Sequence, residues 1–216
     1  MIRAGAAAGR ARAGLVLLHG RGGSARDILG LADALALPDL AVIAPEAPGR
    51  SWWPVSFLSP SAVMEPPLAQ ALAQVAGAVQ ALKADGLAPA QIWLAGFSQG
   101  AGLALESFAR MGEGLAGVIG LSGGLIGTSD APGEPTADLY GHADKRFDYA
   151  GRRDGAKVWM SVHEQDPHIP LARVRTSAEV LRALGAEVSL HVAPGAGHSI
   201  LPQDVARMRA LLNTAN

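Results

Sequence analysis

The chain has 216 residues, enough for one domain with a sizeable hydrophobic core. Its 18 Lys plus Arg and 19 Asp plus Glu give a formal charge of −1, so no global positive field favours nucleic acid or an anionic membrane as a partner. Cysteine is absent, which excludes disulfide bonds, thiolate metal sites and a cysteine nucleophile. With 49% hydrophobic and 17% charged residues, the composition is typical of a chain that folds.

The predicted elements belong to a single domain that spans residues 1–216. Residues 1–13 are rich in Ala, Gly and Arg but lack the apolar region of a targeting peptide, so we expect a flexible or edge lead-in to the first strand and a cytoplasmic protein. No apolar run approaches the roughly 18 residues of a membrane-spanning helix, which predicts no stable membrane insertion. Short aliphatic runs predict strands buried on both faces at 15–18, 40–43, 92–94, 118–121, 158–160 and 188–192.

Segments with helical spacing lie between these strands. The clearest helix is expected to open after Pro66-Pro67 and to end near Asp85-Gly86, and two more are expected around 174–181 and 205–212. Residues 128–155 are rich in Asp, Gly, Pro and Arg and predict a long irregular loop. The alternation of strand and helix predicts an α/β fold with a mostly parallel central sheet and helices on both faces.

The segment Gly96-Phe97-Ser98-Gln99-Gly100 fits the Gly-x-Ser-x-Gly pattern, after a buried strand and before an amphipathic segment. A nucleophile on a sharp strand-to-helix turn needs small flanking residues, and the head of the following helix favours developing negative charge. Ser98 is therefore the candidate nucleophile. The alternative is a serine that only caps a helix after a Gly-rich turn.

A serine nucleophile needs a histidine base and an acid that orients it. His168, His191 and His198 follow Ser98 at sufficient distance, and His191 falls inside an alternating strand pattern. His198 lies in a Gly-rich loop between the last strand and the last helix, where a base can reach the serine; the alternative is a solvated loop histidine. Because a histidine base must be neutral, we expect activity to fall as the pH drops.

The candidate acid is Asp166, which follows the strand at 158–162 and leaves room for one helix and one strand before the histidine. Its rivals are Glu164, Asp144 and Asp148, and an Asp before Pro is also an ordinary turn former.

An oxyanion hole requires two backbone amides. Gln99 supplies one, and the Gly-rich segment His19-Gly20-Arg21-Gly22-Gly23 supplies the other from Arg21 or Gly22. The competing interpretation of this segment, a phosphate-binding loop, is weak because no Gly-Lys-Ser/Thr follows. A zinc-binding helix at residues 163–168 is excluded because the histidines are five residues apart and a proline interrupts the helix, so we expect no metal and no cofactor.

Trp52, Trp53 and Phe57 concentrate apolar surface in a segment without helical or strand period, which continues through Leu58, Val63 and Met64. This segment is either a loop folded onto the core or the wall of an acyl or aromatic pocket beside the serine.

The chain resembles the carboxylesterase/phospholipase family of α/β-hydrolases, which includes the acyl-protein thioesterases. The resemblance covers nearly the whole chain, in the family's order, at residues 17–23, 50–54, 96–100, 121–125, 166–170 and 195–198. It implies an α/β-hydrolase fold with a minimal or absent cap, no cofactor and a shallow, fairly open pocket.

Residue by residue, the resemblance implies Ser98 as nucleophile, Asp166 and His198 as its partners, and the amides of Arg21 and Gln99 as the oxyanion hole. Two features depart from the family pattern. Glu164 stands where relatives often have Gly, and residues 128–155 do not resemble the family closely.

These observations predict a serine hydrolase that cleaves carboxylic esters or thioesters of small to medium acyl chains through an acyl-enzyme on Ser98. One alternative is a lysophospholipase or acyl-protein thioesterase that acts on long-chain lipids. Another is a non-catalytic binding protein on a hydrolase fold. The expected partner is a small-molecule ester or thioester, and a dimer is possible.

Overall fold

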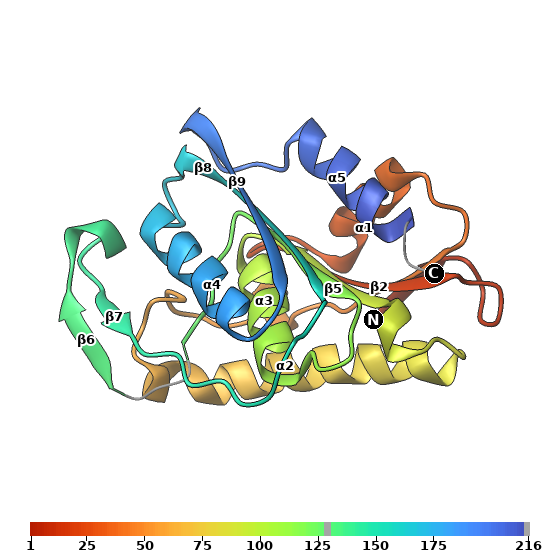
Figure 1. Ribbon diagram of the computed structural model, residues 1–216, viewed down its shortest axis with the longest axis horizontal. Coiled ribbons are helices and arrows are strands. Elements are labelled where there is room, and N and C mark those ends of the chain that lie inside the picture. Colours follow the sequence, from red (N-terminus) through yellow and green to blue (C-terminus); the bar gives the residue numbers. More distant parts are fainter. Residues whose placement is uncertain (128–130, 214–216) are drawn as a thin grey trace.

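The structure, a computed structural model, describes residues 1–127 and 131–213 (Figure 1). Within these residues seven strands form one sheet in the order β1-β3-β2-β4-β5-β8-β9, and β1 alone runs antiparallel to its neighbour. This confirms the expected α/β fold with a mostly parallel sheet. The strands are β1 (Ile2–Gly5), β2 (Ala13–Leu18), β3 (Leu40–Ala44), β4 (Ile92–Phe97), β5 (Gly117–Leu121), β8 (Lys157–Gln165) and β9 (Glu187–Ala196).

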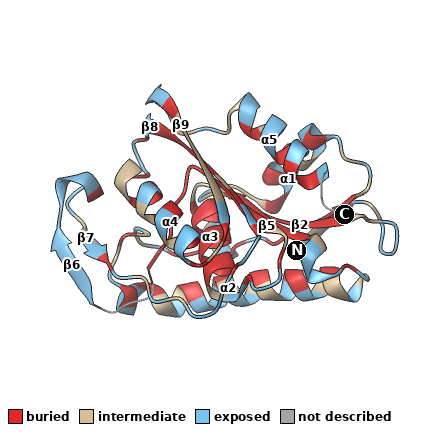
Figure 2. Cartoon of the chain, viewed as in Figure 1, coloured by how far each residue is buried: buried red, intermediate tan, exposed pale blue. Residues whose placement is uncertain are grey.

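Helices cover both faces of this sheet (Figure 1). Alternate residues of β2 serve the two sides: Val16 and Leu18 pack with α2, α3 and α4, whereas Leu15 and Leu17 pack with α1 and α5. Figure 2 shows that the central strands are buried, as expected for strands covered on both faces. The helices are α1 (Ala25–Leu35), α2 (Ser61–Ala84), α3 (Gln99–Met111), α4 (Leu171–Ala183) and α5 (Pro202–Asn213), with short 3-10 turns η1 (Pro48–Arg50) and η2 (Pro89–Gln91).

The start of α2 differs from the expectation, because the helix begins at Ser61 and Pro66 and Pro67 lie inside it. Each proline lacks an N–H and so removes one helical hydrogen bond. Met64 and Leu68 are fully buried on the same face of the helix, and this burial favours helix on both sides of the prolines. The apolar segment that follows the tryptophans is thus partly helical.

The segment between β5 and β8 also differs from the expectation of one irregular loop. Residues 128–130 lie outside the described part of the chain. Beyond them, β6 (Pro132–Pro135) and β7 (Ala143–Lys145) form an antiparallel pair, joined by the 3-10 turn η3 (Ala137–Leu139). This arm projects beyond α4, and β6 is exposed throughout (Figures 1 and 2).

Two further elements were not expected in this form. The lead-in contains the edge strand β1, which pairs with β3. Helix α1 had no sequence prediction; its cap is Ser24, whose Oγ accepts a hydrogen bond from the Asp27 amide at 3.2 Å. None of the helices in the described ranges has the length and apolar character needed to cross a bilayer.

Candidate active site

Ser98 occupies the turn between β4 and α3 in a backbone conformation that L-residues rarely adopt, with φ 55° and ψ −119°. The flanking glycines leave no room for side chains. A Cβ at Gly96 would lie 2.2 Å from the carbonyl oxygen of Gly100, and a Cβ at Gly100 would lie 2.2 Å from that of Leu18. The Gly-x-Ser-x-Gly spacing therefore follows from the close approach of backbone on both sides of the serine.

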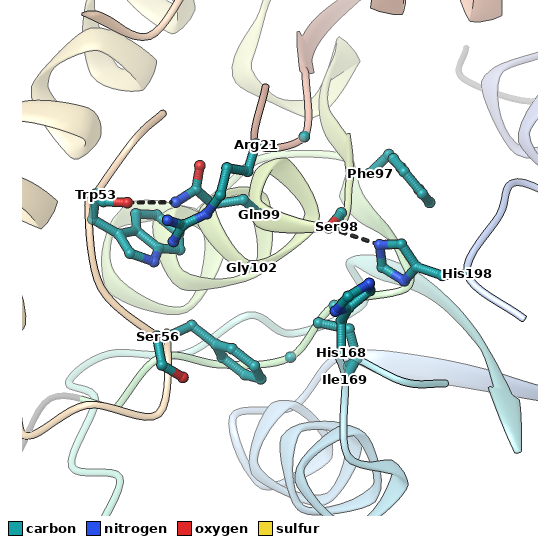
Figure 3. A pocket seen from close by; sticks show the side chains of 14 residues that line it. Arg21, Trp53, Ser56, Phe97, Ser98, Gln99, Gly102, His168, Ile169 and His198 are labelled. Atoms are coloured by element: carbon teal, nitrogen blue, oxygen red, sulfur yellow. Dashed lines mark hydrogen bonds between the residues drawn. The ribbon is translucent and has the colours of Figure 1, made fainter. Parts of the chain in front are cut away.

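The structure brings together the three residues expected to form the catalytic group. Ser98 Oγ lies 2.9 Å from His198 Nε2, and His198 Nδ1 lies 2.8 Å from Asp166 Oδ2. The first contact is drawn in Figure 3. Asp166 follows β8 and His198 follows β9, so neighbouring parallel strands deliver both side chains to one edge of the sheet.

The Asp166 carboxylate is fully buried and well supplied with hydrogen-bond donors. Burial by itself raises its pKa, but the His198 ring and the backbone amides of His168 and Ile169 donate to it, at 2.9 and 3.1 Å for the amides. The net effect is a pKa below the ordinary value of an aspartate. The Tyr140 hydroxyl, from the arm, donates to the backbone carbonyl of the same aspartate.

The rivals for these roles lie elsewhere. Glu164 is exposed on β8, and the exposed Asp144 lies 3.5 Å from the guanidinium of Arg173. His191 stacks on Trp159, with ring centroids 6.1 Å apart. The structure therefore favours Asp166 and His198 as the partners of the serine.

The Gly-rich segment after β2 lies against the serine, since a Cβ at Gly20 would lie 3.3 Å from Ser98 Cβ. The Gly22 amide donates to the Arg50 carbonyl at 2.7 Å, which removes it as a free donor. Among the described residues, no backbone hydrogen bond occupies the amides of Arg21 and Gln99. These two amides are therefore the candidates for an oxyanion hole.

A cavity of about 450 Å³ opens beside the serine, within the usual size range for small-molecule sites. Trp53 and Phe57 line it as expected, but Trp52 does not. The Trp52 ring packs on His19, and its Nε1 donates to the His19 carbonyl at 2.9 Å. Sequence reasoning did not identify these lining residues: Ser56, Phe97, Gly102, Gly123, Gly124, His168 and Ile169.

The Gln99 side chain has a structural task that the sequence did not reveal. Its Oε1 accepts from the Trp52 amide and its Nε2 donates to the Trp53 carbonyl, each at 2.9 Å. The second bond is drawn in Figure 3. One buried amide thus fastens the tryptophan segment to the turn that carries Ser98.

The two histidines of the excluded zinc pattern, His163 and His168, have different surroundings. His163 is buried, and a Cβ at Gly197 would lie 2.7 Å from its ring. His168 lines the cavity, with its ring centroid 4.9 Å from that of His198. In residues 1–127 and 131–213 no cluster of three or more His, Cys, Asp or Glu side chains is arranged to hold a metal ion.

The fold defines the class of protein: it is an α/β-hydrolase. The chain belongs to the phospholipase/carboxylesterase family, whose sequence profile matches residues 4–149. This confirms the resemblance found in the sequence and the expected carboxylesterase-type hydrolase.

Several relatives are similar over different extents of the chain. A phospholipase/carboxylesterase from Dyadobacter fermentans is 33% identical with a TM-score of 0.83, covering 99% of this chain and 95% of that one. Esterase PE8 is 27% identical with a TM-score of 0.75, covering 100% and 98%. Acyl-protein thioesterase 1 of Gibberella zeae is 34% identical over 128 residues, 59% of this chain. That match spans only 49%, about half, of the thioesterase.

Proposed function

We propose that the protein is a serine hydrolase that cleaves carboxylic esters or thioesters of small to medium acyl chains. The observation that carries this proposal is the hydrogen-bonded series from Ser98 through His198 to the buried Asp166, at the edge of a cavity of about 450 Å³. Serine alone is a weak nucleophile at neutral pH, and this arrangement supplies both a base and a group that orients it.

In the proposed reaction, His198 Nε2 takes the proton of Ser98 Oγ as the oxygen attacks the acyl carbonyl. The backbone amides of Arg21 and Gln99 stabilise the negative charge that develops on the carbonyl oxygen, and in other enzymes such a donor contributes about 10²–10³-fold to the rate. His198 then protonates the leaving alcohol or thiol, and the acyl group remains on the serine. Water, deprotonated by the same histidine, releases the acid and restores the enzyme.

The strained backbone at Ser98 supports this role, because such conformations persist where function requires them. The Asp166 carboxylate, with its lowered pKa, stays ionised at neutral pH and stabilises the imidazolium that forms on His198. Phe97 packs on that imidazole with ring centroids 4.9 Å apart and helps to hold its position.

A long-chain activity is the second candidate, because one relative is named an acyl-protein thioesterase. Against it, the cavity is lined by three bulky aromatic residues, Trp53, Phe57 and Phe97, and is modest in volume, which favours shorter acyl groups.

The experiment is hydrolysis of p-nitrophenyl esters from acetate to palmitate by the purified protein and by Ser98→Ala. We expect turnover that is greatest for short to medium chains and absent in the variant. A maximum at palmitate would support the long-chain candidate. No turnover at any length, with Ser98 also unreactive towards a fluorophosphonate probe, would overturn the proposal in favour of a non-catalytic binding protein.

A further inference from the structure

The side chain of Arg21 places a positive charge on the wall of the cavity. Its Nη1 donates to the Pro54 carbonyl at 3.2 Å and its Nη2 donates to the Val55 carbonyl at 2.6 Å. In the described part of the chain no carboxylate forms an ion pair with this guanidinium. The charge is thus held in place by neutral acceptors, and donor capacity remains for a ligand.

Carboxylates of the protein do not offset this charge within the cavity. None of the lining residues is Asp or Glu. Asp27 lines a second, smaller hollow together with Arg21, but its carboxylate accepts from Ser24 Oγ and pairs with Arg50 at 3.3 Å. The Asp166 carboxylate is fully buried and hydrogen-bonded to His198, so its negative charge lies on the imidazole side of the cavity.

The proposed chemistry assigns the two sides of the cavity to different parts of a substrate. His198 must protonate the leaving group, so the alcohol or thiol lies beside the imidazole. The acyl chain then extends away from it, along Gln99 and towards Trp53. In Figure 3 Arg21 and Trp53 lie together on the side of Ser98 that is opposite His198. The guanidinium therefore faces the acyl portion.

We propose that the preferred acyl group carries a second, free carboxylate that Arg21 binds, so that the substrates are monoesters or monothioesters of dicarboxylic acids. This inference rests on the proposed function and specifies its substrate class. A guanidinium suits a carboxylate in charge and in the planar arrangement of its donors. Because two backbone carbonyls already hold the side chain, little rotamer freedom is lost on binding.

The test uses three p-nitrophenyl esters of matched chain length: the monoester of adipate, which carries a carboxylate, the neutral hexanoate, and ε-aminocaproate, which carries an ammonium. We expect kcat/KM to decrease in that order, with the adipate monoester about five- to tenfold above hexanoate, a size consistent with a partly solvated charge pair. The ratio of adipate to hexanoate should fall as salt is added, because the pair is screened.

In Arg21→Met the ratio of adipate to hexanoate should drop to one or below, and in Arg21→Lys it should stay above one. The backbone amide of Arg21 is assigned to the oxyanion hole, and a change there alters the turnover of both esters alike. The ratio of adipate to hexanoate within each variant is therefore unaffected by it. Arg26→Met, which removes an exposed charge on α1 outside the cavity, is the matched control and should leave the ratio unchanged.

Two failures are distinguishable. If hexanoate is turned over through Ser98 but the wild-type ratio is one or less, or the ratio is insensitive to salt, the inference is wrong and the proposed function stands. The same conclusion follows if Arg21→Met folds and keeps the wild-type ratio. If none of the three esters shows Ser98-dependent turnover, the proposed function itself falls. The salt series on the wild-type protein decides the matter even if Arg21→Met does not fold.

Discussion

Asp166→Asn is the substitution that best separates the orientation of His198 from every other part of the proposed mechanism. Asparagine has the same size, and its Oδ1 still accepts from the amides of His168 and Ile169, which lie 2.9 and 3.1 Å from the aspartate oxygen. The NH₂ group then occupies the place of Oδ2, 2.8 Å from His198 Nδ1. The remaining oxygen, Oδ1, is 3.0 Å from Nδ1 and already accepts from two amides, so the nearer NH₂ group decides the tautomer. Because NH₂ only donates, Nδ1 accepts and the ring proton moves to Nε2.

That proton blocks catalysis, since Nε2 is the atom 2.9 Å from Ser98 Oγ that must take the serine proton. The same exchange in a serine protease lowers kcat by about 10⁴-fold, and we expect a loss of that order here. It corresponds to about 5 kcal/mol on the activation barrier. The assay is kcat with p-nitrophenyl butyrate, with circular dichroism to verify that the variant is folded.

Glu164→Gln is the matched control, because Glu164 is the other carboxylate close in sequence and is exposed on β8. Its kcat should stay within about twofold of wild type, as for a surface substitution away from the chemistry. A folded Asp166→Asn variant within tenfold of wild type, or an equal loss in Glu164→Gln, would refute the assignment of Asp166.

Three other predictions follow from buried groups. Gln99→Ala removes two buried hydrogen bonds and leaves the Trp52 amide without a partner, whereas the Trp53 carbonyl still accepts from Ser51 Oγ at 2.7 Å. The substitution should lower the free energy of unfolding by about 2 kcal/mol and the Tm by about 4–8 °C. Gln91→Ala, whose bonds lie nearer solvent, should cost less than about 1 kcal/mol, and equal losses in thermal melts would contradict this. Burial lowers the pKa of Lys145 to about 8, and its Nζ lacks a hydrogen-bond partner among the described residues. Lys145→Met should therefore stabilise the protein by on the order of 2 kcal/mol at neutral pH, a gain that denaturant titrations should find reduced as the pH rises from about 8 towards the ordinary lysine pKa of about 10.4. Because the pKa of Asp166 is lowered, its carboxylate stays ionised as the solution is acidified from neutral pH. The proposed mechanism needs a neutral histidine base, so kcat/KM should fall as the pH drops, and a profile that is flat from about pH 8 to about pH 5 would count against His198 as the base.

Six of the seven strands of the sheet could be predicted from the sequence because each contains a short aliphatic run. The five interior strands are largely buried on both faces, whereas β9, at one edge of the sheet, is mostly half-buried. The edge strand β1 has only half of its residues partly buried, so its sequence, Ile2 to Gly5, lacks the signal. Helix α1 was missed although Ser24 precedes it and residues 28, 31 and 35 have helical spacing. A short helix of this kind is decided by packing against the sheet more than by its own sequence.

Among the candidate site residues, Ser98, Asp166 and His198 could be found because their order along the chain and their places after strands are dictated by the reaction and the fold. That Trp53 lines the cavity whereas Trp52 packs on His19 could not be predicted, since adjacent residues in an irregular segment follow no period. The missing information is tertiary: the Gln99 side chain bonds to the backbone of both residues, and the Trp52 ring is held by its contacts with His19.

This connection has a consequence for how relatives of the protein can diversify. Because Gln99 belongs to the nucleophile's turn and also holds the tryptophan segment, one wall of the pocket is rigidly coupled to the reacting atoms. Enlarging the pocket by moving that wall would disturb the turn as well. The opposite wall contains His168 and Ile169, which follow Asp166 in the chain. Among the described contacts, neither of these residues is hydrogen-bonded to Gln99. New specificities for the leaving alcohol or thiol are therefore expected to arise by substitution of side chains on that side, without disturbing the turn that carries Ser98.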